Sequence, residues 1–296
     1  MDIASFPGSR IVEISRLAFD LPDVDILCFG ESDQPGPPAA RDALVNALDG
    51  GPTLYPDVRG LPPLRHALAE YLSGLHARPV SEERIVVTAS GMAAIAVALT
   101  AILRANDRLV LLSPSWPNLG NAARLRGAQV DEVPLAVSEG GRLQLDLGRL
   151  DEALRGARAF ILNSPNNPTG WTATAEEMAA VLDLCRRHGV WLISDEVYSR
   201  LVYDGAPAAP SALDVADPRD RVIVCNSFSK TWAMTGWRLG WMVVPDGARE
   251  AVAEIIEVTH SGVAPYTQYA GVAALADQAF VARFRDHCAE GRSLVG

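Results

Sequence analysis

The sequence contains very little lysine. Of its 26 basic residues, Lys230 is the only lysine and all the others are arginine. An amine can lose its proton and condense with a carbonyl to form an imine, whereas a guanidinium stays protonated and cannot. A single lysine among arginines is therefore a candidate for covalent chemistry, with drift in a lysine-poor composition as the alternative. Its neighbours favour chemistry, because it ends the segment Ser227-Phe228-Ser229-Lys230 and Arg238 follows shortly after.

Patterns typical of metal sites and of nucleic-acid binding are also lacking. The five histidines show no HExxH spacing, and the four cysteines form no CxxC pair, so no metal site is expected. We expect the cysteines to be buried thiols in a reducing compartment; they are Cys28, Cys185, Cys225 and Cys288. The net charge of -10 argues against nucleic acid as a main partner, because phosphate backbones need clustered Lys and Arg.

Long hydrophobic runs are absent as well. The longest, from Gly91 to Leu103, is too short to span a bilayer. The first residues, Met1 to Pro7, lack the basic region and apolar core of a secretory signal. The sequence therefore predicts a cytoplasmic protein with no membrane segment.

Short apolar runs alternate with longer amphipathic stretches through most of the chain. Hydrophobic residues make up 49% of the sequence, enough for the core of one large domain, or of a large and a small one. The apolar runs read as buried strands at 85–87, 109–112, 160–162, 190–193 and 222–225. The amphipathic stretches read as helices and include 64–72, 92–103 and 176–188. This alternation predicts an α/β fold in which a mainly parallel sheet is flanked by helices.

A polar cluster follows each of these five runs. In chain order the clusters are Thr88-Ala89-Ser90-Gly91, Ser113-Pro114-Ser115-Trp116-Pro117-Asn118, Asn163-Ser164-Pro165-Asn166-Asn167-Pro168-Thr169-Gly170, Ser194-Asp195-Glu196-Val197-Tyr198 and Asn226-Ser227-Phe228-Ser229-Lys230. Parallel strands end at the same edge of a sheet, and ligands of open α/β sheets bind at that edge. The pattern therefore predicts a ligand site built from all five clusters.

An aromatic aldehyde that carries a phosphate suits these clusters if Lys230 forms an imine. Ser90-Gly91-Met92 opens a predicted helix, whose backbone amides and dipole can hold an anion. Ser227 and Ser229 offer hydroxyls, and Arg238 offers a two-pronged cation. Taken alone, Ser90 is more typical of a simple helix cap, and Arg238 is more typical of a solvated surface charge.

A pyridine ring needs an aromatic face and a carboxylate at its nitrogen. Trp116 can supply the face, although core packing also explains it. Asp195 ends a strand so apolar that its carboxylate should be partly buried, and a protonated ring nitrogen is a suitable partner; a helix N-cap is the alternative. Asn167 and Tyr198 can hydrogen-bond a phenolic ring oxygen, or serve only as loop and packing residues.

With these residues in view, the chain resembles the pyridoxal-phosphate enzymes of fold type I, in the class I and II aminotransferase group that includes aspartate aminotransferase. The similarity extends from about Arg10 to about Ala276. The polar clusters that follow the last four apolar runs match this family. Three further segments also match it: Phe29-Gly30-Glu31-Ser32-Asp33, Thr53-Leu54-Tyr55-Pro56 with Gly60-Leu61, and Met234-Thr235-Gly236-Trp237-Arg238-Leu239-Gly240.

The resemblance implies a role for each matching residue. Lys230 forms the imine with pyridoxal 5'-phosphate and later moves the proton, while Asp195 pairs with the ring nitrogen. The phenolic oxygen is bound by Asn167 and Tyr198, and Trp116 stacks on the ring. The phosphate is held by Ser90, Gly91, Met92, Ser227, Ser229 and Arg238.

Further residues are assigned by the same resemblance. Tyr55 reaches the phosphate of a neighbouring subunit, which implies a homodimer with shared sites. Gly30 lies near the substrate carboxylate, and Trp116 and Asn167 also face the substrate.

The resemblance also predicts the domain organisation. Residues 1–38 form an N-terminal segment of a small domain with its linker, 39–278 the large cofactor-binding domain, and 279–296 the start of a helix toward the C-terminal small domain. In the family that small domain, a unit of about 100 residues, supplies the arginine that binds the substrate α-carboxylate. We expect the chain to stop before it, because Arg283, Arg285 and Arg292 come too early for this role.

The predicted activity is transfer of an amino group from an amino acid to a 2-oxo acid by a ping-pong mechanism. Met92 stands where some aspartate-preferring relatives have a lysine, and no arginine occurs between Arg249 and Arg283. A neutral or aromatic donor is therefore the hypothesis for the substrate. The alternatives are carbon–sulfur lysis or decarboxylation on the same scaffold, a catalytically incomplete cofactor-binding fragment, and the sensor half of a transcription regulator.

Overall fold

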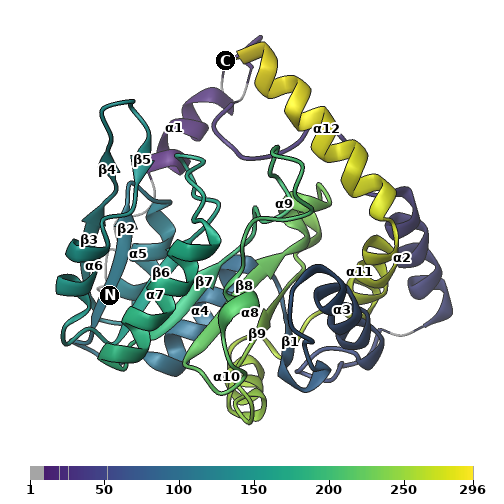
Figure 1. Cartoon of the computed structure of the whole chain (residues 1–296). Coiled ribbons are helices and arrows are strands. Elements are labelled where there is room, and N and C mark those ends of the chain that lie inside the picture. The colour runs from purple at the N-terminus through teal and green to yellow at the C-terminus, as the bar shows by residue number, and fades with distance from the viewer. Residues whose placement is uncertain (1–9, 20, 26, 52, 296) are drawn as a thin grey trace, which may run out of the picture.

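The computed structural model describes residues 10–19, 21–25, 27–51 and 53–295, and within them a seven-stranded sheet forms the centre of the molecule (Figure 1). The strands lie in the order β1-β9-β8-β7-β6-β2-β3. Their bounds are β1 Ile85–Thr88, β2 Arg108–Ser113, β3 Gln129–Pro134, β6 Ala159–Asn163, β7 Trp191–Asp195, β8 Val222–Ser227 and β9 Gly240–Val243. A separate two-stranded ribbon pairs β4 (Ala136–Val137) with β5 (Leu143–Gln144).

Most of the sheet is parallel, as the sequence predicts. Strands β3, β2, β6, β7 and β8 pair in parallel, whereas β9 is antiparallel to both β8 and β1. Two antiparallel pairings in succession make β1 run in the same direction as β8. All five predicted strands are present, and their carboxyl ends therefore lie at one edge of the sheet.

Successive side chains of the strands enter two separate hydrophobic cores, because side chains alternate between the faces of a strand. Phe160 and Leu162 of β6 belong to one core, while Ile161 between them belongs to the other. The first core is covered by α3 (Pro62–Leu75), α6 (Leu147–Leu154), α7 (Ala175–His188), α8 (Ala212–Val215) and α11 (Pro265–Ala276). The second core is covered by α4 (Gly91–Ile102), α5 (Pro117–Arg124) and α10 (Arg249–His260). The fold is therefore a three-layer α/β/α arrangement.

The helices expected at 64–72, 92–103 and 176–188 are present with bounds that differ by at most a few residues. For α7, local sequence explains both ends. Helix α7 begins at a capping box, in which the Thr174 hydroxyl accepts from Glu177 N and the Glu177 carboxylate accepts from Thr174 N. It ends at Gly189, which has a positive φ of 67°. The Ala- and Pro-rich segment 205–218 contains the short helix α8 (Ala212–Val215).

Three further helices belong to the two ends of the chain: α1 (Arg10–Phe19), α2 (Pro38–Gly50) and α12 (Gln278–Val295). Two of them, α2 and α12, add residues to the margin of the first core. Helix α2 packs against α11, and α12 runs from α11 toward the top of Figure 1, where α1 also lies. His287 Nε2 of α12 is 3.0 Å from Asp33 Oδ1, which joins α12 to the segment between α1 and α2. The remaining short elements are η1 (Glu82–Arg84), α9 (Phe228–Thr231) and η2 (Thr235–Trp237).

The cysteines differ in part from the expectation of four buried thiols. Cys185 and Cys225 are buried in the two cores, whereas Cys28 and Cys288 are only partly buried; Cys288 lies on α12 at the margin of the first core. Among the helices in the described ranges, none combines the length and apolar character needed to cross a membrane.

Candidate active site

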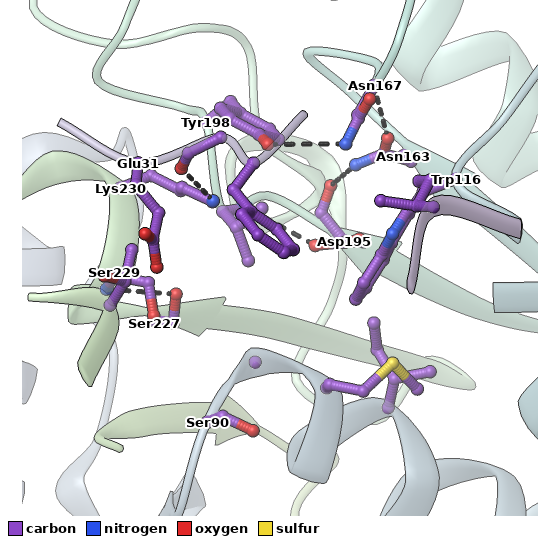
Figure 2. A pocket seen from close by; sticks show the side chains of 18 of the residues that line it. Glu31, Ser90, Trp116, Asn163, Asn167, Asp195, Tyr198, Ser227, Ser229 and Lys230 are labelled. Carbon is purple, nitrogen blue, oxygen red and sulfur yellow. Dashed lines mark hydrogen bonds between the residues drawn. The ribbon is translucent and has the colours of Figure 1, made fainter. Parts of the chain in front are cut away.

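A pocket of about 520 Å³ lies at the sheet edge where the parallel strands end (Figure 2). Every residue that the sequence assigns to the site lines it, apart from Tyr55. These residues are Gly30, Ser90, Gly91, Met92, Trp116, Asn167, Asp195, Tyr198, Ser227, Ser229, Lys230 and Arg238. The polar clusters after five separate strands therefore meet in one cavity, as their positions in the sequence predict.

Lys230 lies in α9, directly after β8, and its amine points into the pocket (Figure 2). Nζ donates a hydrogen bond to Gly30 O at 2.6 Å. Burial lowers the pKa of Lys230, and the nearby carboxylates of Glu31 and Asp195 oppose this effect without cancelling it. A lowered pKa increases the fraction of neutral amine near pH 7, which is the nucleophilic form.

Gly30 gives this amine room. A Cβ at Gly30 would lie 3.1 Å from Lys230 Nζ and 3.5 Å from the Tyr198 hydroxyl. A Cβ at this position would therefore crowd the Lys230 amine, whereas its contact with Tyr198 would be an ordinary van der Waals contact.

Asp195 is the last residue of β7 and only 3% exposed. Burial raises the pKa of its carboxyl to about 7, the hydrogen bond from Val197 N at 3.4 Å opposes this, and the charge of Glu196 adds to it. Within the described part of the chain, no basic side chain forms an ion pair with Asp195. The positive charge of Lys230 is nevertheless close enough to lower the pKa of Asp195 slightly. Residues 197–200 form turns, so the helix-cap explanation for Asp195 is wrong. The buried carboxyl is suited to pair with a cationic atom of a ligand.

Asn167 and Tyr198 approach each other across the pocket. Asn167 Nδ2 donates to the Tyr198 hydroxyl at 3.5 Å. Burial is the main reason that the pKa of Tyr198 is raised, and the charge of Asp195 adds to it. Two neutral donors side by side can bind one anionic oxygen of a ligand.

The opposite side of the pocket offers groups that bind anions. The Ser90 side chain accepts from Ala93 N at 3.0 Å and caps α4, while Gly91 opens that helix. Ser227 Oγ accepts from Ser229 N at 3.3 Å, which keeps both serines at the pocket wall. The Arg238 backbone has a positive φ of 56°, and its guanidinium donates to Thr235 O while lining the same wall.

This wall depends on a close backbone approach at Gly240. A Cβ at Gly240 would lie 2.7 Å from Ser90 C and 2.8 Å from both Asn226 O and Gly91 N. These are backbone atoms of α4 and β8, so they cannot move aside without shifting the start of α4.

We expect Gly240→Ala to destabilise the protein by about 1–3 kcal/mol, because overpacking against backbone forces the elements apart. The matched control is Gly236→Ala, since a Cβ at Gly236 would meet nothing within 4 Å. Urea unfolding monitored by circular dichroism measures both changes. Equal stability of the two variants would contradict the role given to Gly240.

The pocket also contains residues that the sequence analysis leaves unassigned. Asn163 ends β6, and Glu31 follows Gly30; both line the pocket (Figure 2). Both belong to segments that match the family, but their individual contacts could not be read from the chain.

Tyr55 is the one predicted site residue away from this cavity. It is 92% exposed, and its neighbour Leu54 is 82% exposed. No group of three or more His, Cys, Asp or Glu residues in the described ranges is arranged to hold a metal ion.

Comparison with known proteins gives a consistent match. A family model described as "Aminotransferase class I and II" matches residues 23–293. The aspartate aminotransferase of Pyrococcus horikoshii is 30% identical over 267 residues, covering 90% of this chain and 67% of that protein. The valine–pyruvate aminotransferase of Mycobacterium tuberculosis is 37% identical over 230 residues, covering 78% of this chain and 58% of that protein.

Solved structures agree with the sequence matches. A Thermus thermophilus aspartate aminotransferase tetra mutant complexed with tryptophan superposes with a TM-score of 0.92 at 31% identity, covering 99% of this chain and 79% of that one. The matches thus span from just over half to about four fifths of the relatives' lengths. Since the family model covers most of the chain and the fold agrees, this protein belongs to the class I and II aminotransferase family.

Proposed function

We propose that this chain binds pyridoxal 5'-phosphate and transfers an amino group from an amino acid to a 2-oxo acid. The observation that carries the proposal is the meeting of a partly buried amine with a lowered pKa, Lys230, and a buried carboxyl, Asp195, in one pocket. The family, whose members use pyridoxal phosphate, supports this choice over other amine chemistry.

The groups in the pocket fit the cofactor. The Asp195 carboxyl matches a protonated ring nitrogen, which would relieve the cost of burying its charge. Asn167 and Tyr198 match the phenolic oxygen, and Trp116 offers an aromatic face. The phosphate matches the anion-binding wall, formed by Ser90, Gly91, Met92, Ser227, Ser229 and Arg238.

The chain's own residues then account for the proton movements. With the cofactor bound, Lys230 would be the amine that holds it, and the same amine, when free, would act as the base that takes the substrate α-proton and later gives it back. Asp195 would stabilise a positive charge on the ring nitrogen. When bound, pyridoxal phosphate supplies the electron sink that makes loss of the α-proton possible.

The charges lining the pocket favour a donor without a side-chain carboxylate. Its cationic side chains are Lys230 and Arg238, and both have proposed roles with the cofactor. The remaining charged residues, Glu31 and Asp195, are acidic. We therefore propose a neutral or aromatic amino acid as the donor. The relatives do not decide this point, since their names include aspartate, valine and arginine as substrates.

A homodimer is part of the same proposal. Leu54 and Tyr55 are far more exposed than is usual for such large side chains, as expected if they contact a second copy. Sedimentation velocity should give twice the chain mass, and a monomer at micromolar concentration would contradict the proposed sharing of Tyr55.

The activity is tested by supplying the purified chain with pyridoxal phosphate, one amino acid and one 2-oxo acid. We expect the donor's keto acid and the new amino acid in equal amounts, and no more than about one keto acid per cofactor when the acceptor is left out, because the aminated cofactor then has no partner to return its amino group to. Phenylalanine or a neutral donor should give a higher kcat/KM than aspartate. Release of ammonia with pyruvate, or of carbon dioxide, without an acceptor would instead indicate a lyase or a decarboxylase.

A further inference from the structure

We propose that Asn163 is a positioning residue that fixes the separation between Asn167 and Asp195, the groups assigned to the phenolic oxygen and to the ring nitrogen of the cofactor. The inference rests on the proposed function, because it concerns how the same pocket holds its ligand. It assigns a role to a side chain that sequence reasoning leaves unexplained.

Asn163 bridges the two segments that carry those groups. Its Oδ1 accepts from Asn167 N at 2.8 Å, and its Nδ2 donates to Asp195 O at 3.2 Å (Figure 2). The side chain is buried, since Asn163 is only 4% exposed. One amide therefore joins the backbone of the loop after β6 to the end of β7.

The backbone reinforces one side of this bridge. Asn163 and Asp195 are register partners in the parallel β6–β7 pair, and Ser164 N also donates to Asp195 O, at 3.1 Å. The end of β7 is thus held by two donors. Asn167 has no such strand pairing, so the position of its backbone depends more strongly on Asn163.

The chemistry requires an amide at this position. Each bond uses one half of the group, the oxygen as acceptor and the nitrogen as donor, and a buried polar group left without a partner is costly. An aliphatic residue of similar volume would fill the space but leave Asn167 N–H without its acceptor.

Other side chains support the same loop without touching the pocket. Ser164 Oγ accepts from Ala173 N at 3.0 Å, and Asn166 Oδ1 accepts from Thr169 N at 3.2 Å. Neither Ser164 nor Asn166 is among the residues that line the pocket, whereas Asn163 is. Ser164 therefore provides a matched control, since Ser164→Ala also removes one buried hydrogen bond from this loop.

The consequence of losing Asn163 should appear at Asn167. Its amide donates to the Tyr198 hydroxyl and, with the cofactor bound, is assigned to the phenolic oxygen. If the loop relaxes, this donor is no longer held in place. The bound cofactor with an anionic phenolic oxygen then loses a stabilising hydrogen bond. Its protonated form is favoured, so the pH at the midpoint of its visible absorption change rises.

The experiment compares Asn163→Leu, Asn163→Ser and Ser164→Ala with the unaltered chain. Thermal melts of the cofactor-free proteins first show that each is folded, and the smaller serine serves if leucine does not fold. For the Asn163 variants we expect the Kd for pyridoxal phosphate to rise about tenfold, the factor for one lost hydrogen bond. The spectral midpoint should rise by about half to one pH unit. Ser164→Ala should lower only the melting temperature.

A double-mutant cycle with Asn167→Ala separates positioning from general loosening. If Asn163 acts through Asn167, adding Asn163→Leu to Asn167→Ala should produce little further shift of the midpoint. An equal shift with and without Asn167 would overturn the inference, as would Asn163 variants that bind and titrate like the unaltered chain. If the unaltered chain binds no pyridoxal phosphate, the proposed function fails and the inference with it.

Discussion

Replacing Lys230 with alanine is expected to abolish turnover, with a loss of at least about a thousandfold, and to remove the visible band of the bound cofactor. Lys230 is the only lysine of the chain, so no other side-chain amine can take over its role. Its lowered pKa, caused mainly by burial, fits an amine that must act in the neutral form. Steady-state assays and absorption spectra measure the two effects.

Lys230→Arg is the matched control for charge. The guanidinium keeps a positive group near Glu31 and Asp195 but cannot form an imine or act as a base near pH 7. We expect it to be as inactive as alanine. Small primary amines added to the solution should partly restore proton transfer in Lys230→Ala and not in Lys230→Arg, whose side chain fills the space. Substantial turnover by either variant without added amine would refute the mechanism.

Replacing Asp195 with alanine should lower kcat by a hundredfold or more, while cofactor affinity falls less. The reason is that a buried carboxylate stabilises charge that develops on the ring during reaction, and removal of one such group typically costs about 10²–10³ in rate. Affinity is shared with the phosphate-binding wall, so it depends less on one residue. Rates and cofactor titrations measure the two separately, and a near-normal rate would reject the role given to Asp195.

In the cofactor-free protein, the same carboxyl should also make the stability of the fold depend on pH. The pKa of Asp195 is raised to about 7 from an unfolded value of 3.8, so between these values the folded state holds a proton that the unfolded state has released. Stability from this group is therefore present at low pH and lost as pH rises toward 7. Asp195→Asn should remove that loss of stability. Above pH 7, the free energy of unfolding of the variant should exceed that of the unaltered protein by up to about 4 kcal/mol. Urea unfolding at pH 5 and pH 8 tests this, and a pH-independent difference between the two proteins would contradict it.

The sequence predicts which residues line the pocket better than it predicts the order of the strands in the sheet. The five buried strands are apolar on both faces and are recognisable as short runs, but β3 is an edge strand in which polar and apolar residues mix and half of the residues are exposed. Strand β9 begins at Gly240, the last residue of a segment that matches the family, and nothing local indicates that it runs antiparallel. Such pairings depend on long-range packing, which periodicity does not encode.

Contacts between distant segments show the same limit. The hydrogen bond from Lys230 to Gly30 joins residues 200 positions apart in the chain. Likewise the bridge made by Asn163 depends on the β6–β7 register and on the direction of one buried amide. The chemistry of each residue could be proposed from its type and place after a strand, but the positioning contacts required the fold.

The central claim is that Lys230 is the amine that holds the cofactor. Incubation of the purified chain with pyridoxal phosphate, reduction with borohydride and peptide mass spectrometry tests it directly, because the only other amine in the sequence is the chain terminus. The account predicts a reduced cofactor adduct on the peptide containing Lys230, in about one copy per chain. An unmodified Lys230 peptide under conditions that saturate the protein would contradict it.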